Sequence, residues 1–509
     1  MKRLILLFSC FCLGVSAQQT FNGFALYSLQ DKSYLVDKDG LVAHTWNCNV
    51  NENYAVLLKD NGNIVRGGKY SNNQLNGAAV GGMVQEIDAN GNVVWEFVYS
   101  DANYVSHHDI TLIGDNVLLT AWEVKTANEV NALGGNTNSD KWPTHFVEVA
   151  QDGTGGKIVW EWHIWDHLCQ DVDPSKPNYV SNISDHPELI DVNMIQSSGG
   201  GGSGGGSGDW FHVNGVDYNP ELDQIAFSSR FASEIYIIDH STTTTEAASH
   251  SGGNSGMGGD ILYRWGNPSN YNQSGQQVIP DAVHDVRWIK NDGRPNGGYL
   301  QIFNNKGGGS NPVQSTIDAI NPPLDPNGYT YQKTAGVAYA PATYDWRYSC
   351  VYSAPGQSAS DRMSNGNTFI NASGGQGGAG IMYEVDSLGN LVWSYNPSGG
   401  DPKKAFRYEC DHPGIIALLN NPCNISLDAS NISNENIVFS PNPSQGKFNI
   451  LGLYDNQIQI IIYDSMGVKK FEEKNIDNFD ISYLPNGIYY VKIIMPEGEE
   501  LTHLLSLIR

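Results

Sequence analysis

The sequence predicts an all-β protein built from repeated antiparallel hairpins, followed by a second, smaller β unit. Short strand-like runs joined by Asp/Asn/Gly turns recur along most of the chain, and long helical patterns are absent. The composition agrees, because 56 glycines in 509 residues and only 16% charged residues are typical of turn-rich β structure. Recurring hairpins at intervals of tens of residues favour a β-propeller or a similar closed repeat fold.

The chain begins with a pattern typical of a secretory signal peptide, Met1–Ala17. Lys2 and Arg3 form its charged start, an apolar run follows, and small residues ending at Ala17 form the cleavage site. No later stretch is long enough to span a membrane. We therefore expect an exported protein that has no transmembrane segment once the signal is removed.

The net charge and the cysteines limit which partners, disulfides and metal sites the sequence supports. Loss of Lys2 and Arg3 changes the formal net charge from −25 to −27, which repels phosphate backbones and excludes nucleic acid as a partner. Export permits disulfides, and Cys410 and Cys423 are near enough in sequence to close a loop. No CxxC spacing is present, which argues against a zinc site, and we expect neither a metal nor a cofactor. The other cysteines left after cleavage are Cys48, Cys169 and Cys350.

One hairpin repeat ends each time on tryptophan. Each copy is a short strand, a turn rich in Asp, Asn and Gly, and a second strand, with Gly supplying the positive φ that the turn needs. The four copies are YLVDKDGLVAHTW (Tyr34–Trp46), QEIDANGNVVW (Gln85–Trp95), EVAQDGTGGKIVW (Glu148–Trp160) and EVDSLGNLVW (Glu384–Trp393).

A second repeat interleaves with the first and places histidine at one hairpin position. Its copies are HDITLIGDNVLL (His108–Leu119), the segment that begins at His212, HDVRWI (His284–Ile289) and SDRMSNGNTFI (Ser360–Ile370), the last without histidine. In a propeller the innermost strand of each blade lines the central channel. Three imidazoles at one repeat position would then meet in one cavity, where one acts as nucleophile and another moves protons.

The segment Gly208–His240 is the strongest pointer to function. It reads as three strands joined by two turns, and His212, Asn214 and Val216 alternate on one face of the first strand. Polar residues stand there where a core strand would carry Val or Ile. Histidine followed by aspartate also serves to tie strands together, and that use stays open for each of the three histidines.

A metal site ranks below catalysis for these histidines. Asp109 and Asp285 lie one step along their strands and so point to the other side. His163 and His167 lie four apart, but Val159–Trp165 reads as strand, which argues against a metal-binding pair. The remaining histidines, His250 among them, are isolated, and surface or packing roles are commoner for such residues.

The large unit ends near residue 419, and a change in composition separates it from the rest of the chain. We expect a polar linker at 420–436 and a compact all-β unit at 437–509. The expected strands of this unit are Ile437–Ser440, Lys447–Leu451, Gln457–Asp464, Gly487–Ile494 and Leu501–Leu507. Within the large unit, Ser197–Gly208 is a glycine-rich connection and reads as a flexible loop.

Several segments between Phe21 and Leu419 together resemble the bacterial arylsulfotransferase family. They are HTW (His44–Trp46), HHDI (His107–Ile110), VWEWHIWDHL (Val159–Leu168), DWFHVNGVDYNPELDQIAFSSR (Asp209–Arg230), GGDILYRWGNP (Gly258–Pro268), HDVRWI (His284–Ile289), FNN (Phe303–Asn305) and NGNTFI (Asn365–Ile370). The resemblance implies a six-bladed propeller over residues 18–419. It also implies transfer of sulfate from one phenol ester to another through a sulfated histidine, without a nucleotide donor.

The resemblance also assigns site residues. His212 and His284 match two active-site histidines of the family, and Lys306 stands where the family has an arginine, which removes the bidentate fork. The nucleophilic histidine of the family would fall within Pro355–Ser360, where this chain has none, and His108 or His284 would have to replace it. Asn214, Lys306 and Arg230 are the expected substrate-binding residues.

The C-terminal unit resembles the sorting domain of the type IX (Por) secretion pathway. The matching segments are SPNPSQGKFNI (Ser440–Ile450), IIIYDSMG (Ile460–Gly467) and LPNGIYYVKI (Leu484–Ile493). This resemblance implies that the secretion machinery is a partner, and that the protein passes through the periplasm and is then released or held at the outer cell surface.

The sequence therefore predicts an exported sulfotransferase with a phenolic sulfate as donor and a phenol as acceptor. The alternative is a non-catalytic surface propeller that binds sulfated or aromatic ligands, which the missing histidine near Ser358 favours. A third hypothesis is a structural surface protein in which the histidines serve strand packing.

Overall fold

The chain folds into two compact units in the computed structural model, Met1–Cys423 and Asn424–Arg509. The structure describes residues 19–194, 208–275, 280–419, 422–424, 438–442, 444–451, 458–464, 468–474, 476, 478–494 and 500–508. The predicted signal peptide, most of the predicted linker and the glycine-rich stretch 197–207 lie outside these residues.

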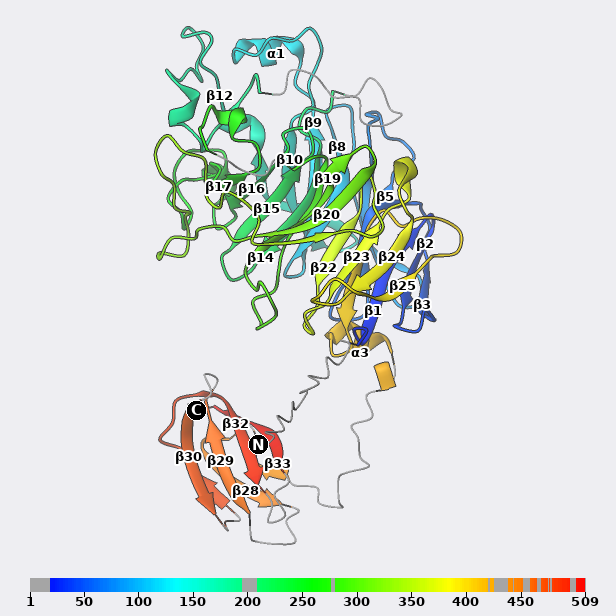
Figure 1. Cartoon of the computed structure of the whole chain (residues 1–509), viewed down its shortest axis with the longest axis vertical. Helices are drawn as coiled ribbons and strands as arrows, with labels where there is room; N and C mark the ends of the chain where they lie inside the picture. The colour runs from blue at the N-terminus through cyan, green and yellow to red at the C-terminus, as the bar shows by residue number, and fades with distance from the viewer. Residues whose placement is uncertain are drawn as a thin grey trace, which may run out of the picture. The chain divides into compact units, whose positions relative to one another are not determined.

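The described part of the larger unit is dominated by six four-stranded antiparallel sheets (Figure 1). In strand order the sheets are β26-β1-β2-β3 (Ala405–Glu409, Gly23–Leu29, Lys32–Val36, Val42–Asn47), β4-β5-β6-β7 (Glu52–Leu58, Ile64–Lys69, Gly82–Ile87, Val93–Val98), β8-β9-β10-β11 (Tyr104–Ile113, Asn116–Glu123, Thr144–Asp152, Gly155–His163), β14-β15-β16-β17 (Val213–Asn219, Gln224–Ser229, Glu234–Asp239, Tyr263–Trp265), β18-β19-β20-β21 (Val283–Trp288, Leu300–Ser310, Val313–Ile320, Trp346–Ser349) and β22-β23-β24-β25 (Ala359–Arg362, Thr368–Ala372, Ile381–Val385, Leu391–Tyr395). The all-β prediction is confirmed.

The hairpins predicted from the tryptophan repeat are the third and fourth strands of four of these sheets. Their strands pair antiparallel, as β2 with β3, β6 with β7, β10 with β11 and β24 with β25. The tryptophan that ends each hairpin is buried, because it packs in a hydrophobic cluster between its own sheet and a neighbouring one. The histidine repeat forms the first and second strands, as in β8 with β9 and β18 with β19.

Hydrophobic clusters fill the spaces between successive sheets. In one of them Trp46 of the first sheet packs with Leu58 of the second, and in another Phe369 of the last sheet packs with Tyr27 of the first. Four more clusters join the sheets between these, so each described sheet has a buried contact on both faces. Burial of this apolar area is the main stabilising term of the unit.

The first strands of the six sheets contact one another in the order β4, β8, β14, β18, β22, β26 and again β4, and we call them the inner strands. At five of these contacts, a side chain on one inner strand accepts a backbone N–H from the next. The pairs are Asp109 with Val216 N (3.0 Å), Asp217 with Trp288 N (2.8 Å), Asp285 with Ser360 N (3.1 Å), Asp361 with Arg407 N (2.9 Å) and Tyr408 with Leu58 N (2.9 Å). The recurring aspartates therefore bond between sheets, as expected if the His–Asp pairs serve to tie strands together.

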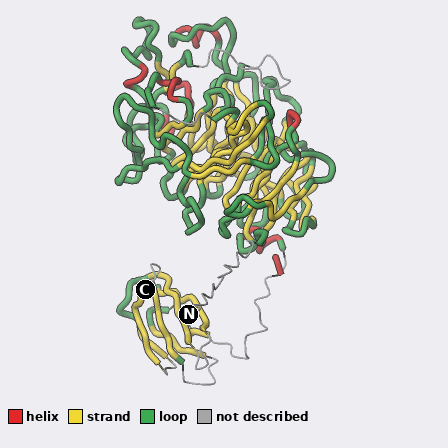
Figure 2. The backbone as a smooth tube through the Cα atoms, in the orientation of Figure 1, coloured by secondary structure: helices red, strands yellow, loops and turns green. Residues whose placement is uncertain are grey.

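Helices and two short parallel strands lie in the connections of the larger unit (Figure 2). They are α1 (Ala127–Ala132), α2 (Thr244–Ala247), α3 (Pro413–Leu418), the 3-10 helices η1 (Ile164–His167), η2 (Ile183–Asp185), η3 (Pro268–Tyr271), η4 (Gly375–Gly377) and η5 (Pro422–Asn424), and strands β12 (Leu168–Cys169) and β13 (Ile190–Asp191). The strand expected over Val159–Trp165 is wrong at its end, because β11 stops at His163 and η1 begins at Ile164.

The described residues of the larger unit contain one disulfide. Cys410 and Cys423 form it just after β26, while Cys48, Cys169 and Cys350 are buried and reduced. Among the described residues of the whole chain, we find no helix with the length and apolar character needed to cross a membrane.

The described residues of the smaller unit form two sheets that share one hydrophobic core. One sheet is β27-β28-β31 (Val438–Ser440, Lys447–Leu451, Asn478–Asp480), and the other is β30-β29-β32-β33 (Lys469–Lys474, Gln459–Tyr463, Gly487–Ile494, Glu500–Leu507). Strands β30 and β31 are not among those predicted from the sequence. The run Lys469–Lys474 is highly charged, and it forms a strand because it pairs with β29 at the edge of the sheet.

Candidate active site

The three predicted histidines lie beside irregularities in inner strands. His108 lies in β8, His212 directly precedes β14 and His284 lies in β18, and the strand register shifts next to each of them. His108 and His212 both have a φ of 51°, a left-handed conformation that non-glycine residues rarely adopt. Such strained β-bulges re-aim side chains and occur preferentially at functional sites. The bulge between Val213 and Gly215 also breaks the simple alternation expected of His212, Asn214 and Val216.

The structure brings these rings into one cluster. The ring centroids of His108 and His212 are 4.6 Å apart, and Tyr54 of β4 lies 5.9 Å from His108. Tyr54 accepts a hydrogen bond from Gln357 Nε2 at 3.3 Å, and the backbone N–H of Gln357 donates to His284 Nε2 at 3.2 Å. The cluster therefore draws side chains from four inner strands or their flanks, plus the loop before β22.

Asp209 fixes the proton on His212. The carboxylate Oδ2 of Asp209 lies 2.6 Å from His212 Nδ1, and its Oδ1 accepts the backbone N–H of His212 and the indole N–H of Trp122. A carboxylate can only accept, so Nδ1 carries the hydrogen and Nε2 of the neutral ring keeps its lone pair. Burial favours the protonated acid, but the adjacent His212 ring outweighs it and keeps the pKa of Asp209 below its usual value.

His284 is held at both ring nitrogens. Nδ1 lies 2.7 Å from Asn305 Oδ1 and 2.8 Å from the carbonyl of Ala282, so it is the donor. Nε2 is consequently the acceptor that Gln357 N–H uses. Burial, followed by the charges of Arg230 and His212, lowers the pKa of His284 well below its usual value, which keeps this ring neutral.

His107 and His108 form a buried pair. Their Nδ1 atoms lie 2.7 Å apart, so one donates to the other, and neither Nε2 has a partner among the described residues. Burial lowers the pKa of His107 to about 3, and burial, aided by the nearby His212 and His107 rings, lowers the pKa of His108 well below its usual value. Both rings are therefore neutral at physiological pH, and His107 stacks on Trp122 at 3.9 Å.

The expected substrate-binding residues differ in how free they are. Both ends of the Asn214 amide are engaged, since Nδ2 donates to the carbonyl of Val283 and Oδ1 accepts from Ser228 Oγ. Lys306 Nζ is 3.9 Å from Asp281 and its side chain is 27% exposed. Arg230 makes no side-chain hydrogen bond within the described part of the chain, and its backbone N–H donates to the carbonyl of His212.

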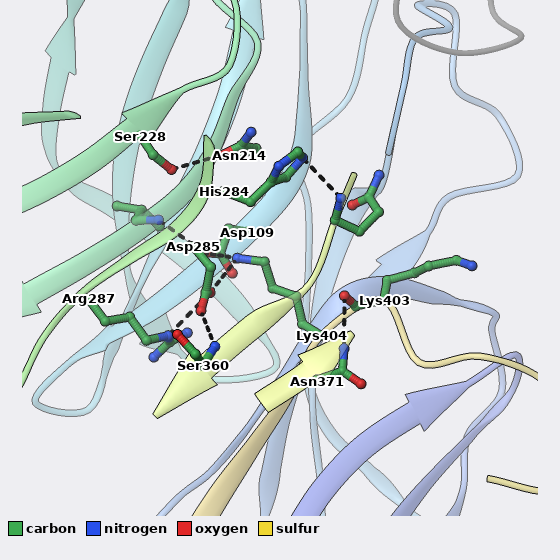
Figure 3. A network of polar contacts seen from close by, with 12 residues as sticks. Asp109, Asn214, Ser228, His284, Asp285, Arg287, Ser360, Asn371, Lys403 and Lys404 are labelled. Carbon is green, nitrogen blue, oxygen red and sulfur yellow. Dashed lines mark hydrogen bonds and ion pairs between the residues drawn. The ribbon is translucent and has the colours of Figure 1, made fainter. Parts of the chain in front are cut away.

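A buried ion network lies beside the histidines (Figure 3). Lys404, directly before β26, places its ammonium 2.7 Å from Asp109 and 2.9 Å from Asp285, and Arg287 lies 3.3 Å from Asp285. Asp109, Asp285 and Lys404 are almost completely buried, so each charge depends on the others. This network joins three inner strands and explains why the aspartates that follow His108 and His284 turn away from the histidine cluster.

Two segments of the chain match known protein families. The chain matches the arylsulfotransferase (ASST) family over residues 15–332 and the secretion system C-terminal sorting domain over residues 438–504. The protein is therefore an exported sulfotransferase-type protein. It belongs to the arylsulfotransferase family, and its sorting domain directs it through the type IX pathway to the cell surface or outside. A search of curated proteins found no match.

Solved structures that are similar to this chain share little sequence with it. A protein of unknown function from Bacteroides caccae is 11% identical, with 76% of this chain and 98% of that chain covered at a TM-score of 0.41. The calcium-binding protein regucalcin from Agrobacterium tumefaciens is 8% identical, with 70% and 81% covered at a TM-score of 0.32. Likeness at this level carries no argument about function.

Sequence reasoning missed several members of the cluster. Asp209, His107, Tyr54 and Gln357 all contact the predicted histidines, yet none was singled out as functional. The spacing of Asp209 three residues before His212 in DWFH was a usable signal, because an acceptor so near can reach a ring in a bulged segment. Tyr54 and Gln357 carry no comparable signal, since only the fold brings them near.

Proposed function

We propose that the protein is a nucleotide-independent aryl-sulfate sulfotransferase whose six sheets are the blades of a propeller, with the active site at the inner strands. Family membership supports sulfate transfer. The contacts among the inner strands and the clusters between sheets support the closed arrangement. The main observation that supports the site is the Asp209–His212 pair. Because Asp209 holds the hydrogen on Nδ1, Nε2 of His212 has a lone pair, and the ring lies beside His108.

The first step is attack of His212 Nε2 on the sulfur of a phenolic sulfate ester. The N–S bond forms, the S–O bond to the aryl group breaks, and its electron pair leaves with the phenolate. The ring then carries a positive charge and a sulfonate group. Asp209 stabilises this charge through Nδ1–H, which is the role of the orienting acid in nucleophile–histidine systems. In this assignment His212 takes the part that the family gives to a histidine within Pro355–Ser360.

The second step returns the lone pair to Nε2. The oxygen of an acceptor phenol attacks the same sulfur, the new S–O bond forms and the N–S bond breaks. The phenol proton passes to a neutral imidazole, and His108 is the candidate because its ring is neutral and its Nε2 has no described partner. His108 then releases the proton to water, which balances the phenolate set free in the first step. His284 is a neutral, oriented ring next to it.

Cations would hold the sulfate oxygens during both steps. Arg230 is placed best, because its guanidinium makes no hydrogen bond among the described residues and its charge contributes to the lowered pKa of His284. Lys306 is the second cation. A fixed positive charge aimed at oxygens that gain charge in the transition state is the largest common contribution to such catalysis.

The test is release of p-nitrophenol from p-nitrophenyl sulfate with phenol as acceptor. We expect ping-pong kinetics and a loss on the order of 10³-fold or more in His212→Ala and a large loss in His284→Ala, with full activity in the control His186→Ala. Donor-treated protein without acceptor should carry sulfate on the His212 peptide in mass spectrometry. Wild-type release no faster than that of His212→Ala would reject catalysis at this pair.

A second candidate is a non-catalytic propeller that binds sulfated or aromatic ligands. One observation favours it: the backbone of Gln357 occupies His284 in the loop where the family resemblance places a nucleophile. Saturable binding of p-nitrophenyl sulfate without p-nitrophenol release would establish this function instead.

A further inference from the structure

Two histidines and an aspartate gather outside the inner strands. His167 ends η1, His250 follows α2, and Asp260 precedes β17. Their ligand-capable atoms all lie within 4.8 Å of one another, and this is the one such group among the described residues. His167 Nδ1 is 2.8 Å and His250 Nδ1 is 2.7 Å from the same oxygen, Asp260 Oδ1.

Both ring nitrogens of His167 face hydrogen-bond acceptors, and a neutral ring has only one N–H to donate. Its Nε2 lies 2.9 Å from the carbonyl of Ala247, which only accepts, so Nε2 carries the hydrogen. The lone pair of a neutral ring is then on Nδ1 and faces the carboxylate oxygen of Asp260. Two acceptors at 2.8 Å repel each other, so this ring needs either a second proton or a cation bound at Nδ1.

The surroundings favour the cation. In proteins, a histidine that binds a metal usually donates its other ring N–H to a carbonyl or carboxylate, as His167 does to Ala247. The ring is fully buried and stacks on Trp162 at 5.5 Å with the planes 7° apart, so its direction is fixed. At Gly259 a Cβ atom would lie 2.7 Å from His167 Nε2 and 2.0 Å from the carbonyl of Ala247, so the backbone closes around the ring.

We propose that His167 Nδ1, His250 Nδ1 and Asp260 bind a divalent transition-metal ion, with Zn²⁺ as the first choice. Two imidazoles and one carboxylate are ordinary Zn²⁺ ligands, and the solvent side at His250, which is 62% exposed, leaves room for water as the fourth. Hard ions such as Ca²⁺ and Mg²⁺ prefer oxygen ligands and would bind poorly.

The site would fasten one sheet to the next. His167 follows the last strand of the third sheet, β11, while His250 and Asp260 lie in the connection between β16 and β17 of the fourth sheet. A metal here would therefore hold a glycine-rich connection against its neighbour. This role is independent of sulfate transfer, so the two proposals fail separately.

The experiment measures Zn²⁺ bound to the full mature chain by equilibrium dialysis and calorimetry. We expect one ion per chain, a higher melting temperature with Zn²⁺, and no such response to Ca²⁺ or Mg²⁺. His250→Ala should weaken binding by at least roughly tenfold, since even loss of a partner behind a metal ligand commonly costs that much. Its exposed position means that the apo variant should fold like the wild type.

Two variants sharpen the result. Asp260→Asn removes the ligand charge and should also lose Zn²⁺, whereas His186→Ala removes another exposed histidine that pairs with a carboxylate, Glu188, and should bind Zn²⁺ normally. Equal Zn²⁺ binding in wild type and His250→Ala overturns the proposal. Absence of Zn²⁺ binding by the wild type also overturns it, and then a protonated His167 paired with Asp260 explains the geometry.

Discussion

The histidines of the inner strands differ from His163 and His240, which lie nearer the outer strands, in what their rings face. The inner histidines, His107, His108 and His284, are buried among other rings and cations, and burial lowers the pKa of each. The outer histidines His163 and His240 are also partly buried, yet hydrogen bonds to carboxylates outweigh burial and raise their pKa. One residue type thus serves as a neutral base in one region and as a charged clamp in the other.

This difference shows how a strongly acidic chain keeps the histidine bases of its inner strands neutral. The chain carries 54 acidic residues, yet one carboxylate, Asp209, hydrogen-bonds a ring of the described inner cluster. The aspartates of the inner strands are bonded instead to backbone N–H groups and to Lys404. Asp209, which orients His212, is therefore the one carboxylate near the described cluster whose partners include a histidine ring.

The largest expected effect comes from breaking the Asp209–His212 pair. In Asp209→Asn the side-chain amide can donate to Nδ1, which moves the ring hydrogen to Nε2 and removes the nucleophilic lone pair. We expect kcat to fall on the order of 10⁴-fold, as in other systems where the orienting acid of a histidine becomes an amide. The measurement is p-nitrophenol release at saturating donor, with circular dichroism to confirm folding.

Asp260→Asn is the matched control, because it changes an equally buried aspartate beside an outer histidine. It should leave kcat unchanged. Equal kcat in Asp209→Asn and wild type would show that the inner pair has no role beyond packing.

The next effect concerns acid stability. Burial lowers the pKa of His107 to about 3, whereas an unfolded histidine titrates near its usual value of about 6.5. As the pH falls below about 6.5 the unfolded chain binds a proton that the folded chain refuses, so stability is lost. For this one group the loss between pH 7 and pH 5 is about 2 kcal/mol.

His107→Phe keeps a ring against Trp122 without the titration. Urea unfolding at both pH values should show that the variant loses about 2 kcal/mol less than the wild type on acidification. The same loss in both proteins would mean that His107 is protonated in the folded state. His186→Phe, at the surface, should behave like the wild type.

The smallest effect is the reverse pH dependence at an outer histidine. His240 lies 2.7 Å from Asp223 and 3.0 Å from Glu148, and these carboxylates raise its pKa in the folded state despite burial. Its stabilising effect is therefore complete below about pH 6.5 and is lost as the pH rises through the folded-state value.

His240→Gln keeps a hydrogen bond but no charge. Its unfolding free energy should fall below that of the wild type at pH 6, and the gap should shrink by pH 9, where the wild-type ring has lost its charge. A gap that widens with rising pH would contradict the contrast between the two groups of histidines.

The hairpins could be predicted because their signals are local and repeated. A strand that ends on Trp after an Asp/Gly turn pairs with its neighbour wherever it occurs, so spacing alone located β2–β3, β6–β7, β10–β11 and β24–β25. The same reasoning failed for β30, where charge hides an edge strand whose partner supplies the pairing.

Much of the candidate site could not be predicted, because it depends on backbone that departs from regular strand. A left-handed φ at His108 and His212 leaves no mark in composition or periodicity. The group His167, His250 and Asp260 is assembled from connections far apart in the chain, and the error at His163, where the strand ends, hid it further. Local patterns give the hairpins, while tertiary packing decides which irregular residues meet.

The pairing of β26 with β1 has a consequence for export. The first residues of the larger unit and nearly the last share one sheet, so a polypeptide that ends before β26 leaves its opening strand with β2 on one side and no partner on the other. The sorting domain, which directs secretion, follows later in the chain, at residues 438–504. Any chain that includes the sorting domain therefore already contains every strand of the larger unit. A chain that ends before β26 lacks the sorting domain as well.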